Sequence, residues 1–282
     1  MLEKPVTDYA HHGALTDPGP HGALFDDLPT DVAELSQIVQ GLLIHDAFGR
    51  DLYGAVPAGF QAASRETLPI PSRIGAILAA RDAPLSVARP PEQRSIGTCR
   101  DFALLLCAML RQQGTPARVR CGFAKYFHPP SYEDHWVCEY WRRDRQAWTK
   151  VDPQLDAEHR AHLEIGFDTT DLPADQFLFA WQVWRMVQNE GADPALFGHG
   201  ETTGAWFIQV NLARDLLSLH KREVSPWDRW REAPAAQREL NCEATLLCDR
   251  MAALAKSAQG LAPPGQGDVR LTAFLSLPPW QR

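Results

Sequence analysis

Residues 95–118 read SIGTCRDFALLLCAMLRQQGTPAR, and this stretch decides the fold. Thr98 is a favourable N-cap residue, and Asp101 follows three residues later in an acidic variant of the capping box. The run FALLLCAML has no polar face, so we expect a helix that is buried on nearly every side. Gly114 can adopt the left-handed conformation after the last turn, and Pro116 prevents the helix from continuing.

Cys99 would be the first residue of this helix. Helix N-termini carry partial positive charge and unpaired N–H groups, which favour a thiolate and lower the pKa of a thiol from about 8.5. The same N–H groups can donate to a developing oxyanion. We therefore expect Cys99 to be a reactive thiol, whereas Cys107, in mid-helix among leucines, is expected to be inert core.

The composition is that of an ordinary globular protein, with 45% hydrophobic and 22% charged residues among 282. The formal net charge of −7 and the lack of any basic run argue against nucleic-acid binding. No apolar stretch reaches the roughly 18 residues of a membrane span, and the N-terminus lacks the apolar region of a secretory signal. We therefore expect a cytoplasmic protein with neither a nucleic-acid nor a membrane partner.

Neither the cysteines nor the histidines have the spacing of a metal site or a disulfide framework. The six cysteines include no CxxC pair, so we expect most of them to be buried thiols. His11, His12 and His21 have no carboxylate or cysteine at ligand spacing, and the pair His159 and His162 is equally isolated. We expect no metal and no other cofactor.

The chain divides into four segments. Residues 1–28 are rich in Pro, Gly, Asp and His and are expected to form an extended arm. Residues 29–165 are expected to form a core with N-terminal helices, residues 166–260 a helical cover packed on it, and residues 261–282 a tail. Besides the helix that begins at Cys99, we expect helices at about residues 30–50, 72–81, 176–191, 205–223, 225–234 and 237–260.

Three strands are expected after the Cys99 helix, at about residues 117–128, 134–143 and 146–152. The first contains ARVRCGF, in which polar or small residues alternate with apolar ones, as in a strand. The polar, turn-like segment RRDRQ between the last two predicts a hairpin.

His135 lies near the start of the second strand, and Asp152 ends the third. If the hairpin loop has an even number of residues, either two or four, the two side chains share one face and lie within reach of each other. An odd loop would put them on opposite faces. If they meet, Asp152 can fix the imidazole tautomer while the other ring nitrogen takes the proton of Cys99, which is the Cys–His–Asp arrangement of nucleophilic acyl transfer.

Three segments resemble the motifs of the transglutaminase-like superfamily and occur in the same order: GTCRDFALLLCAMLRQQGTPAR, DHWVCEYW and AWTKVDPQLD. The flanks of these segments look like those of bacterial transglutaminase-domain proteins. The resemblance covers roughly residues 73–156. It implies an α+β, papain-like core in which the buried Cys99 helix packs on an antiparallel sheet, with helical layers on both flanks. It also implies that Cys99 is the nucleophile, His135 the base and Asp152 the orienting acid.

The resemblance implies a cysteine acyltransferase or hydrolase that acts at an amide or thioester carbonyl through a thioester acyl-enzyme, with no cofactor. The partners would be a small-molecule or peptide acyl donor, an amine or water acceptor and, in some cases, a carrier protein. No acidic calcium loop is present, so no calcium site is carried over. Two alternatives stay open: a peptidase or amidase that uses water, and a catalytically silent binding module that keeps the fold.

Three more side chains are candidates for substrate binding. Arg94 is a candidate for contacting an anionic substrate group. Trp136 either walls the site or packs in the core, and Asp134 either orients the loop beside His135 or caps it.

The C-terminal half has two further groups of residues with open roles. Its tryptophans either pack in the core or roof the cleft; they are Trp181, Trp184, Trp206, Trp227 and Trp230. Three polar residues either line the pocket or join networks that stabilise helices; they are Asn211, Arg214 and Asp215.

Overall fold

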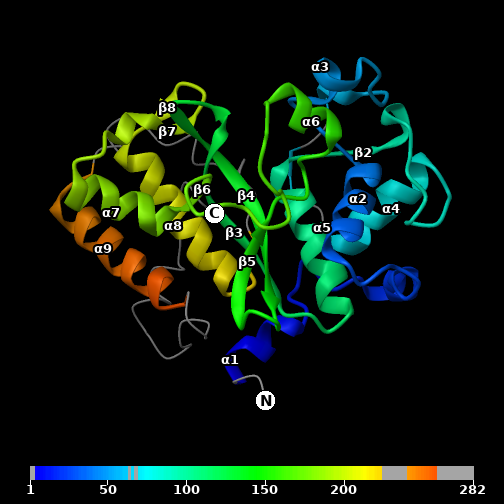
Figure 1. Cartoon of the computed structure of the whole chain (residues 1–282), viewed down its shortest axis with the longest axis horizontal. Coiled ribbons are helices and arrows are strands. Elements are labelled where there is room, and N and C mark those ends of the chain that lie inside the picture. Colours follow the sequence, from blue (N-terminus) through cyan, green and yellow to red (C-terminus); the bar gives the residue numbers. More distant parts are fainter. Residues whose placement is uncertain (1–3, 63–64, 67–68, 224–239, 259–282) are drawn as a thin grey trace.

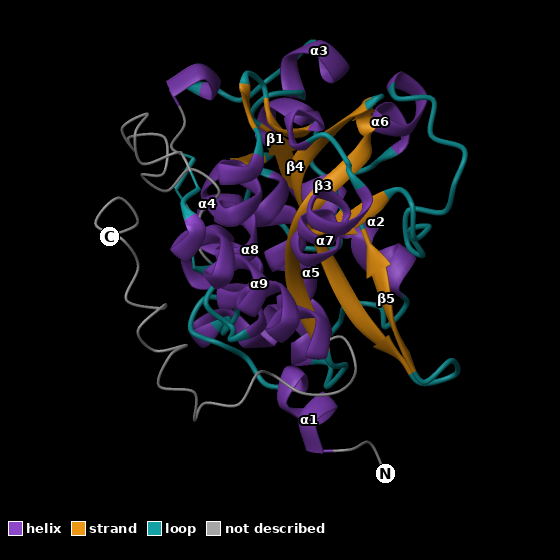
Figure 2. Cartoon of the chain, turned by 90° about the vertical axis from the view of Figure 1, so that its left-hand side faces the viewer, coloured by secondary structure: helices purple, strands orange, loops and turns teal. Residues whose placement is uncertain are grey.

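The computed structural model of the chain describes residues 4–62, 65–66, 69–223 and 240–258. A mixed α+β structure results, in which a central sheet separates two groups of helices (Figure 1). One group is α2 (Val32–Leu42), α4 (Ile70–Ala80) and α5 (Cys99–Gln112), and the other is α7 (Ala180–Glu190), α8 (Ala205–Leu219) and α9 (Cys242–Ser257). Figure 2 looks from the side of the second group, whose helices lie in front of the strands.

Two long antiparallel strands form the middle of the sheet. They are β3 (Ala117–His128) and β4 (Ser131–Arg142), which pair from Ala117↔Tyr140 to Ala124↔Glu133. The shorter strands are β5 (Ala147–Val151) and β7 (Phe197–His199) on β4, β6 (Phe177–Phe179) on β3, and β8 (Thr202–Thr203) on β7. The prediction of three strands with a hairpin between the last two is confirmed.

Helix α5 begins at Cys99, as its sequence predicts, and packs against this sheet. The carboxylate of Asp101 accepts hydrogen bonds from the backbone N–H and the hydroxyl of Thr98, at 2.8 and 3.2 Å. Every residue from Arg100 to Arg111 is buried, because sheet and helices surround α5. Gly114 follows the helix with φ +73°, the left-handed conformation expected there.

The helix expected at residues 30–50 ends earlier than predicted. After Leu42 the chain forms strand β1 (Leu43–His45), which pairs in parallel with β2 (Ser95–Gly97). The short helices α3 (Gly49–Tyr53) and α6 (Ala157–His162) lie nearby at one end of the molecule (Figure 1). The prediction rested on apolar residues at helical spacing, and Leu43, which fits that spacing, belongs to β1. A strand of three residues is too short to show a spacing of its own.

The N-terminal segment is packed on the protein, and its prediction as an extended arm is wrong. It contains helix α1 (Lys4–Thr7) and two 3₁₀ turns. Tyr9 is fully buried and donates to the carbonyl of Leu219 at 2.8 Å, while Arg111 donates to the hydroxyl of buried Thr16 at 2.8 Å. Single side chains make these contacts, so no sequence periodicity reveals them.

The C-terminal helices and the sheet share one core. Strands β6, β7 and β8 come from the segment expected to be a helical cover, so a boundary at residue 165 does not separate two packing units. Trp181, Trp184 and Trp206 are buried in the core on this side, which favours the packing role. Several predicted features lie outside the described residues: Trp227, Trp230, the helix expected at 225–234 and the tail from 261. Within the described part of the chain, no helix combines the length and apolarity needed to span a bilayer.

Charged side chains lie buried between β3, β4 and α8. Arg118 and Arg120 donate to Glu139, each at 2.7 Å, and Arg120 also binds both carboxylate oxygens of Asp215. The alternation in ARVRCGF therefore gives two buried faces, one of which is charged and covered by α8. The paired charges compensate one another there.

Candidate active site

The Cys99 thiol is fixed where β2 turns into α5. Asp101, two residues into the helix, also pairs with Arg73 of α4 at 2.9 Å, and both side chains are buried. Arg73 donates in addition to the hydroxyl of Ser95 and the carbonyl of Ile96, at 2.9 and 2.6 Å. The residues before Cys99 are thereby held by α4 as well as by the capping interaction.

The strand register brings His135 and Asp152 together. Strand β5 pairs with β4 as Cys138↔Val151, the register expected for a two-residue loop, so the two side chains share a face. Nε2 of His135 lies 2.7 Å from Oδ2 of Asp152, and both side chains are buried. Because Nε2 bonds to Asp152, Nδ1 is the ring nitrogen that is free for Cys99.

Two further donors hold the Asp152 carboxylate. The hydroxyl of Tyr126 donates to Oδ2 at 2.6 Å, and the backbone N–H of Gln154 donates to Oδ1 at 3.0 Å. Burial raises the pKa of Asp152, but the positive charge of His135 and these hydrogen bonds outweigh it and lower the pKa below its ordinary value. Asp152 is therefore a fixed, ionised partner for the imidazole.

The pKa values of the thiol and the imidazole are both raised. Burial lowers the pKa of His135, but the charge and hydrogen bond of Asp152 outweigh it and raise the pKa to about 10. Burial raises the pKa of Cys99, opposed by its hydrogen bond with His135 and by the backbone N–H of Trp136. The expectation that the helix start lowers the pKa of Cys99 is therefore wrong in sign, because loss of water around the sulfur outweighs the favourable contacts.

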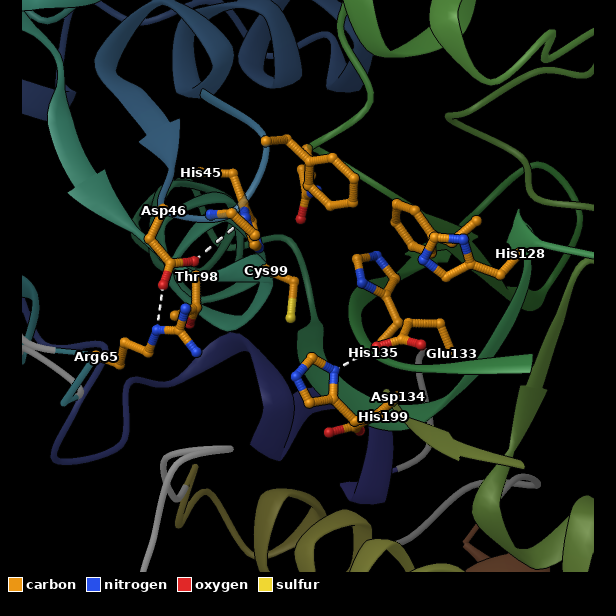
Figure 3. Close-up of a pocket in the computed structure, with 14 residues that line it drawn as sticks. His45, Asp46, Arg65, Thr98, Cys99, His128, Glu133, Asp134, His135 and His199 are labelled. Atoms are coloured by element: carbon orange, nitrogen blue, oxygen red, sulfur yellow. Dashed lines mark hydrogen bonds and ion pairs between the residues drawn. The ribbon is translucent and has the colours of Figure 1, made fainter. Parts of the chain in front are cut away.

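A cavity of about 280 Å³ opens onto Cys99 and His135. Figure 3 shows both side chains in this pocket, with His45 and Asp46 on one side and Glu133 and His199 on another. Its lining comprises His45, Asp46, Ala47, Phe48, Arg65, Thr98, Cys99, Phe127, His128, Glu133, Asp134, His135, Gln154 and His199. The strands β1, β3, β4 and β7 and the start of α5 all contribute to it.

The charged residues of the lining occur as pairs. Arg65 binds Asp46, and His199 binds Glu133 (Figure 3). His45 is neutral: its Nδ1 accepts the backbone N–H of Ala47 at 3.1 Å, and burial lowers its pKa well below the ordinary value. The 3.3 Å approach of His45 to Asp46 is consequently a contact with an uncharged ring and not an ion pair.

The three residues predicted to bind substrate have different surroundings. Asp134 lines the cavity, but it lies within β4 and not in a loop. Trp136 is fully buried in the core on the α5 side, so its side chain packs and does not wall the cavity. Arg94 is not part of the lining: its Nε donates to the carbonyl of Arg89 at 2.9 Å, and its guanidinium lies 5.0 Å from the centre of the Tyr53 ring.

The polar residues of α8 form a network with the sheet. Asn211 donates to Asp134 at 2.9 Å, Arg214 lies 3.5 Å from the same carboxylate, and Asp215 binds Arg120. Of the two roles left open by the sequence, this arrangement supports the stabilising network. Burial raises the pKa of Asp134, although the charge of Arg214 opposes the rise.

Sequence reasoning missed three residues of this site. Tyr126 gave no signal, since a tyrosine in a strand is ordinary. His45 reaches the site through the β1–β2 pairing, where it lies opposite Gly97 and so close to Cys99. Gln154 follows Asp152 by two residues, and only the cavity reveals its place.

A metal centre has no support in the described part of the chain, where no three His, Cys, Asp or Glu side chains come together as a ligand set. His12 contacts Gln112 at 3.1 Å, and Nδ1 of His159 lies 2.8 Å from Asp156. These two histidines therefore have protein partners.

Comparison with known proteins finds a similarity in one part of the chain. Residues 80–153 match the model of the transglutaminase-like superfamily, a region that includes Cys99, His135 and Asp152. A protein from Cytophaga hutchinsonii, named as a candidate cysteine protease, has a solved structure with a TM-score of 0.33 and 18% identity. That match covers 54% of this chain and 43% of that protein, so the chain spans less than half of its length. No curated protein matches the chain.

Proposed function

We propose that the protein is a cysteine-dependent acyltransferase or hydrolase, because residues 80–153 match the model of the transglutaminase-like superfamily. The observation that carries the proposal is that Cys99 and His135 line one cavity and that Asp152 is bonded to the ring of His135. The thiol lies at a helix start, the imidazole lines the same cavity and lowers the pKa of the thiol, and a carboxylate orients the imidazole. These are the three parts that nucleophilic acyl transfer needs.

In the reactive state, His135 is an imidazolium and Cys99 a thiolate. The raised pKa of His135 keeps its proton on the ring at neutral pH, so the ring supplies a positive charge beside the sulfur. The thiolate attacks the carbonyl carbon of an amide or thioester, and the carbonyl electrons move to oxygen. When the carbonyl re-forms, the bond to the leaving group breaks, and His135 gives that group its proton.

The resulting thioester is resolved by an acceptor. An amine or water attacks its carbonyl, gives a proton to the now neutral His135, and displaces the Cys99 thiolate. The first N–H groups of α5 have no partner within the helix, and in this proposal they donate to the oxyanion in both steps. Transfer and hydrolysis differ only in the acceptor. A small-molecule or peptide acyl donor fits the proposal, and so does an acyl group delivered by a carrier protein.

An acyl-enzyme measurement tests this proposal. We expect p-nitrophenyl acetate to leave one acetyl group on Cys99, detected by intact mass and peptide mapping after acid quenching. The exposed Cys242 is the reference thiol, and Cys242→Ser is the matched variant that should keep the acetylation. His135→Ala should slow acetylation of Cys99 by about 10³-fold or more. Acetylation of Cys242 with none on Cys99 would contradict the proposal and favour a silent binding module.

A further inference from the structure

Gln154 lies in the wall of the Cys99 cavity with its side-chain amide unsatisfied. The residue is 1% exposed, and neither Oε1 nor Nε2 has a hydrogen-bond partner among the residues that the structure describes. Its backbone N–H bonds to Asp152, so the residue is held at a fixed place relative to the Asp152–His135 pair. A buried amide without a partner destabilises a fold, and its presence beside a thiol therefore points to a ligand.

The same cavity has an uncharged, largely apolar part. The ring centres of Phe127 and Phe48 lie 5.6 Å apart, so these two rings form a continuous apolar surface. The centre of the Phe127 ring also lies 4.9 Å from that of His135, which borders this surface. His45, which also lines the cavity, is neutral. In such surroundings a hydrogen bond is stronger than in water, and an unpaired amide is more costly.

The chemistry of the carboxamide narrows the class of ligand. Its Oε1 only accepts and its Nε2 only donates, so a single group satisfies both atoms only if it offers a donor and an acceptor side by side. A carboxylate would satisfy only Nε2, and an ammonium group only Oε1. Within one trans amide the N–H and C=O point in opposite directions, so a single amide does not satisfy both. The N–H and C=O of one extended residue in a peptide lie side by side and satisfy both.

We propose that Gln154 binds one extended residue within the acyl group of the donor substrate, accepting from the N–H and donating to the C=O of that residue. This C=O is distinct from the carbonyl that Cys99 attacks. The substrate class is then a neutral peptidyl group. The inference rests on the proposed function, since it places the acyl donor in the Cys99 cavity.

Two alkylating probes of matched shape test this inference. N-acetylglycylglycine chloromethyl ketone, the amide probe, carries a glycine residue whose N–H and C=O are both distinct from the ketone, and 1-chlorononan-2-one replaces its two amides with methylene groups. The Cys99 thiolate displaces chloride from either probe and forms a thioether. The labelling rate of Cys99 is measured by mass spectrometry and divided by the rate with glutathione. We expect the wild type to prefer the amide probe by about tenfold or more on this scale, as one satisfied hydrogen-bonding group provides.

Variants assign the preference to Gln154. In Gln154→Leu the corrected ratio of the two rates should fall to near one, while Gln37→Leu, on an exposed position of α2, should keep it. Because leucine removes an unsatisfied polar group, the Tm of Gln154→Leu should equal or exceed that of the wild type. Any of three results would overturn the inference. The wild type could show no preference, the preference could survive in Gln154→Leu, or the Tm of Gln154→Leu could be lower than that of the wild type by several degrees.

Failure of the proposed function has a different signature. His135→Ala acts on the thiol and not on the amide, so it should slow both probes by the same factor. If His135→Ala leaves both rates unchanged, the proposed function fails, whatever the ratio of the rates shows. If both rates fall together and only the ratio contradicts the expectation, the proposed function stands and the role of Gln154 fails.

Discussion

Nε2 of His135 lies 2.7 Å from Oδ2 of Asp152, where both side chains are buried. The charge of this carboxylate holds the pKa of His135 near 10, against the effect of burial. The imidazole is therefore an imidazolium at neutral pH, and Cys99 reacts beside a positive charge. Several expectations about pH and stability depend on this pair.

Asp152→Asn should move the alkaline limit of activity to lower pH. Without the carboxylate, the pKa of His135 falls from about 10, and the imidazolium that protonates the leaving group is lost earlier. The pH–rate profile of Cys99 acylation by an amide, such as p-nitroacetanilide, measures the shift, because an amine leaves only when it is protonated whereas p-nitrophenolate leaves without a proton. Tyr126→Phe is the matched control, because it removes a 2.6 Å hydrogen bond to the same oxygen but keeps the charge. An alkaline limb that stays in place in Asp152→Asn would contradict this role.

The same pair should make stability depend on pH. The folded-state pKa of His135 is raised from 6.5 to about 10. The imidazolium therefore contributes fully to the free energy of unfolding below pH 6.5, and this contribution is lost as pH rises through about 10. The difference in the free energy of unfolding between wild type and His135→Gln should thus shrink between these pH values. Denaturant unfolding at pH 6, 8 and 10 measures it. A constant difference would mean that the imidazole is neutral in the folded protein.

The ion pairs of Arg120 should matter for stability and not for chemistry. Asp215→Ala removes two hydrogen bonds from a buried guanidinium and should cost about 3–5 kcal/mol in the free energy of unfolding. Since Arg120 does not line the cavity, the pH–rate profile of Cys99 in the folded fraction should keep its shape. Chemical denaturation and acetylation kinetics on the same sample separate the two effects. A displaced profile would show that Asp215 influences the site.

Gly122 should tolerate no side chain. It pairs with His135 on β4 and with Phe179 on β6, and a Cβ there would lie 2.2 Å from the carbonyl oxygen of Leu178. Because that atom belongs to the backbone, Gly122→Ala must push β6 away from β3, at a cost of about 1–3 kcal/mol or more. Thermal unfolding measures the loss. Gly75→Ala, at a position in α4 with no atom within 4 Å of an added Cβ, is the control that should not be destabilised.

The sequence predicts the centre of the molecule well because local signals determine it. The Thr98–Asp101 cap and the apolar run suffice to place α5, and the strand patterns suffice to place β3, β4 and β5. The sequence left the parity of the hairpin loop open, and the observed register is what brings His135 to Asp152. The prediction fails where structure depends on contacts distant in sequence. Tyr9 is buried where its hydroxyl donates to the carbonyl of Leu219, and β1 is a strand because it pairs with β2.

The same reason explains what was missed at the site. The pKa of Cys99 depends on how much water surrounds the sulfur, and a helix start alone does not reveal that. Arg94 was the cationic candidate, but folding brings Arg65 to the cavity instead. The unsatisfied amide of Gln154 is visible only once its neighbours are known.

The central claim is that Cys99 reacts because His135 lies beside it, and one measurement tests this most directly. The rate of iodoacetamide labelling is followed from pH 6 to 10 at Cys99 and, as an internal reference, at the exposed Cys242. We predict that His135→Ala shifts the pH dependence of Cys99 to higher pH, because it removes the hydrogen bond and the charge that lower the pKa of the thiol. The profile of Cys242 should not move. A Cys99 profile that is the same in wild type and His135→Ala would contradict the account.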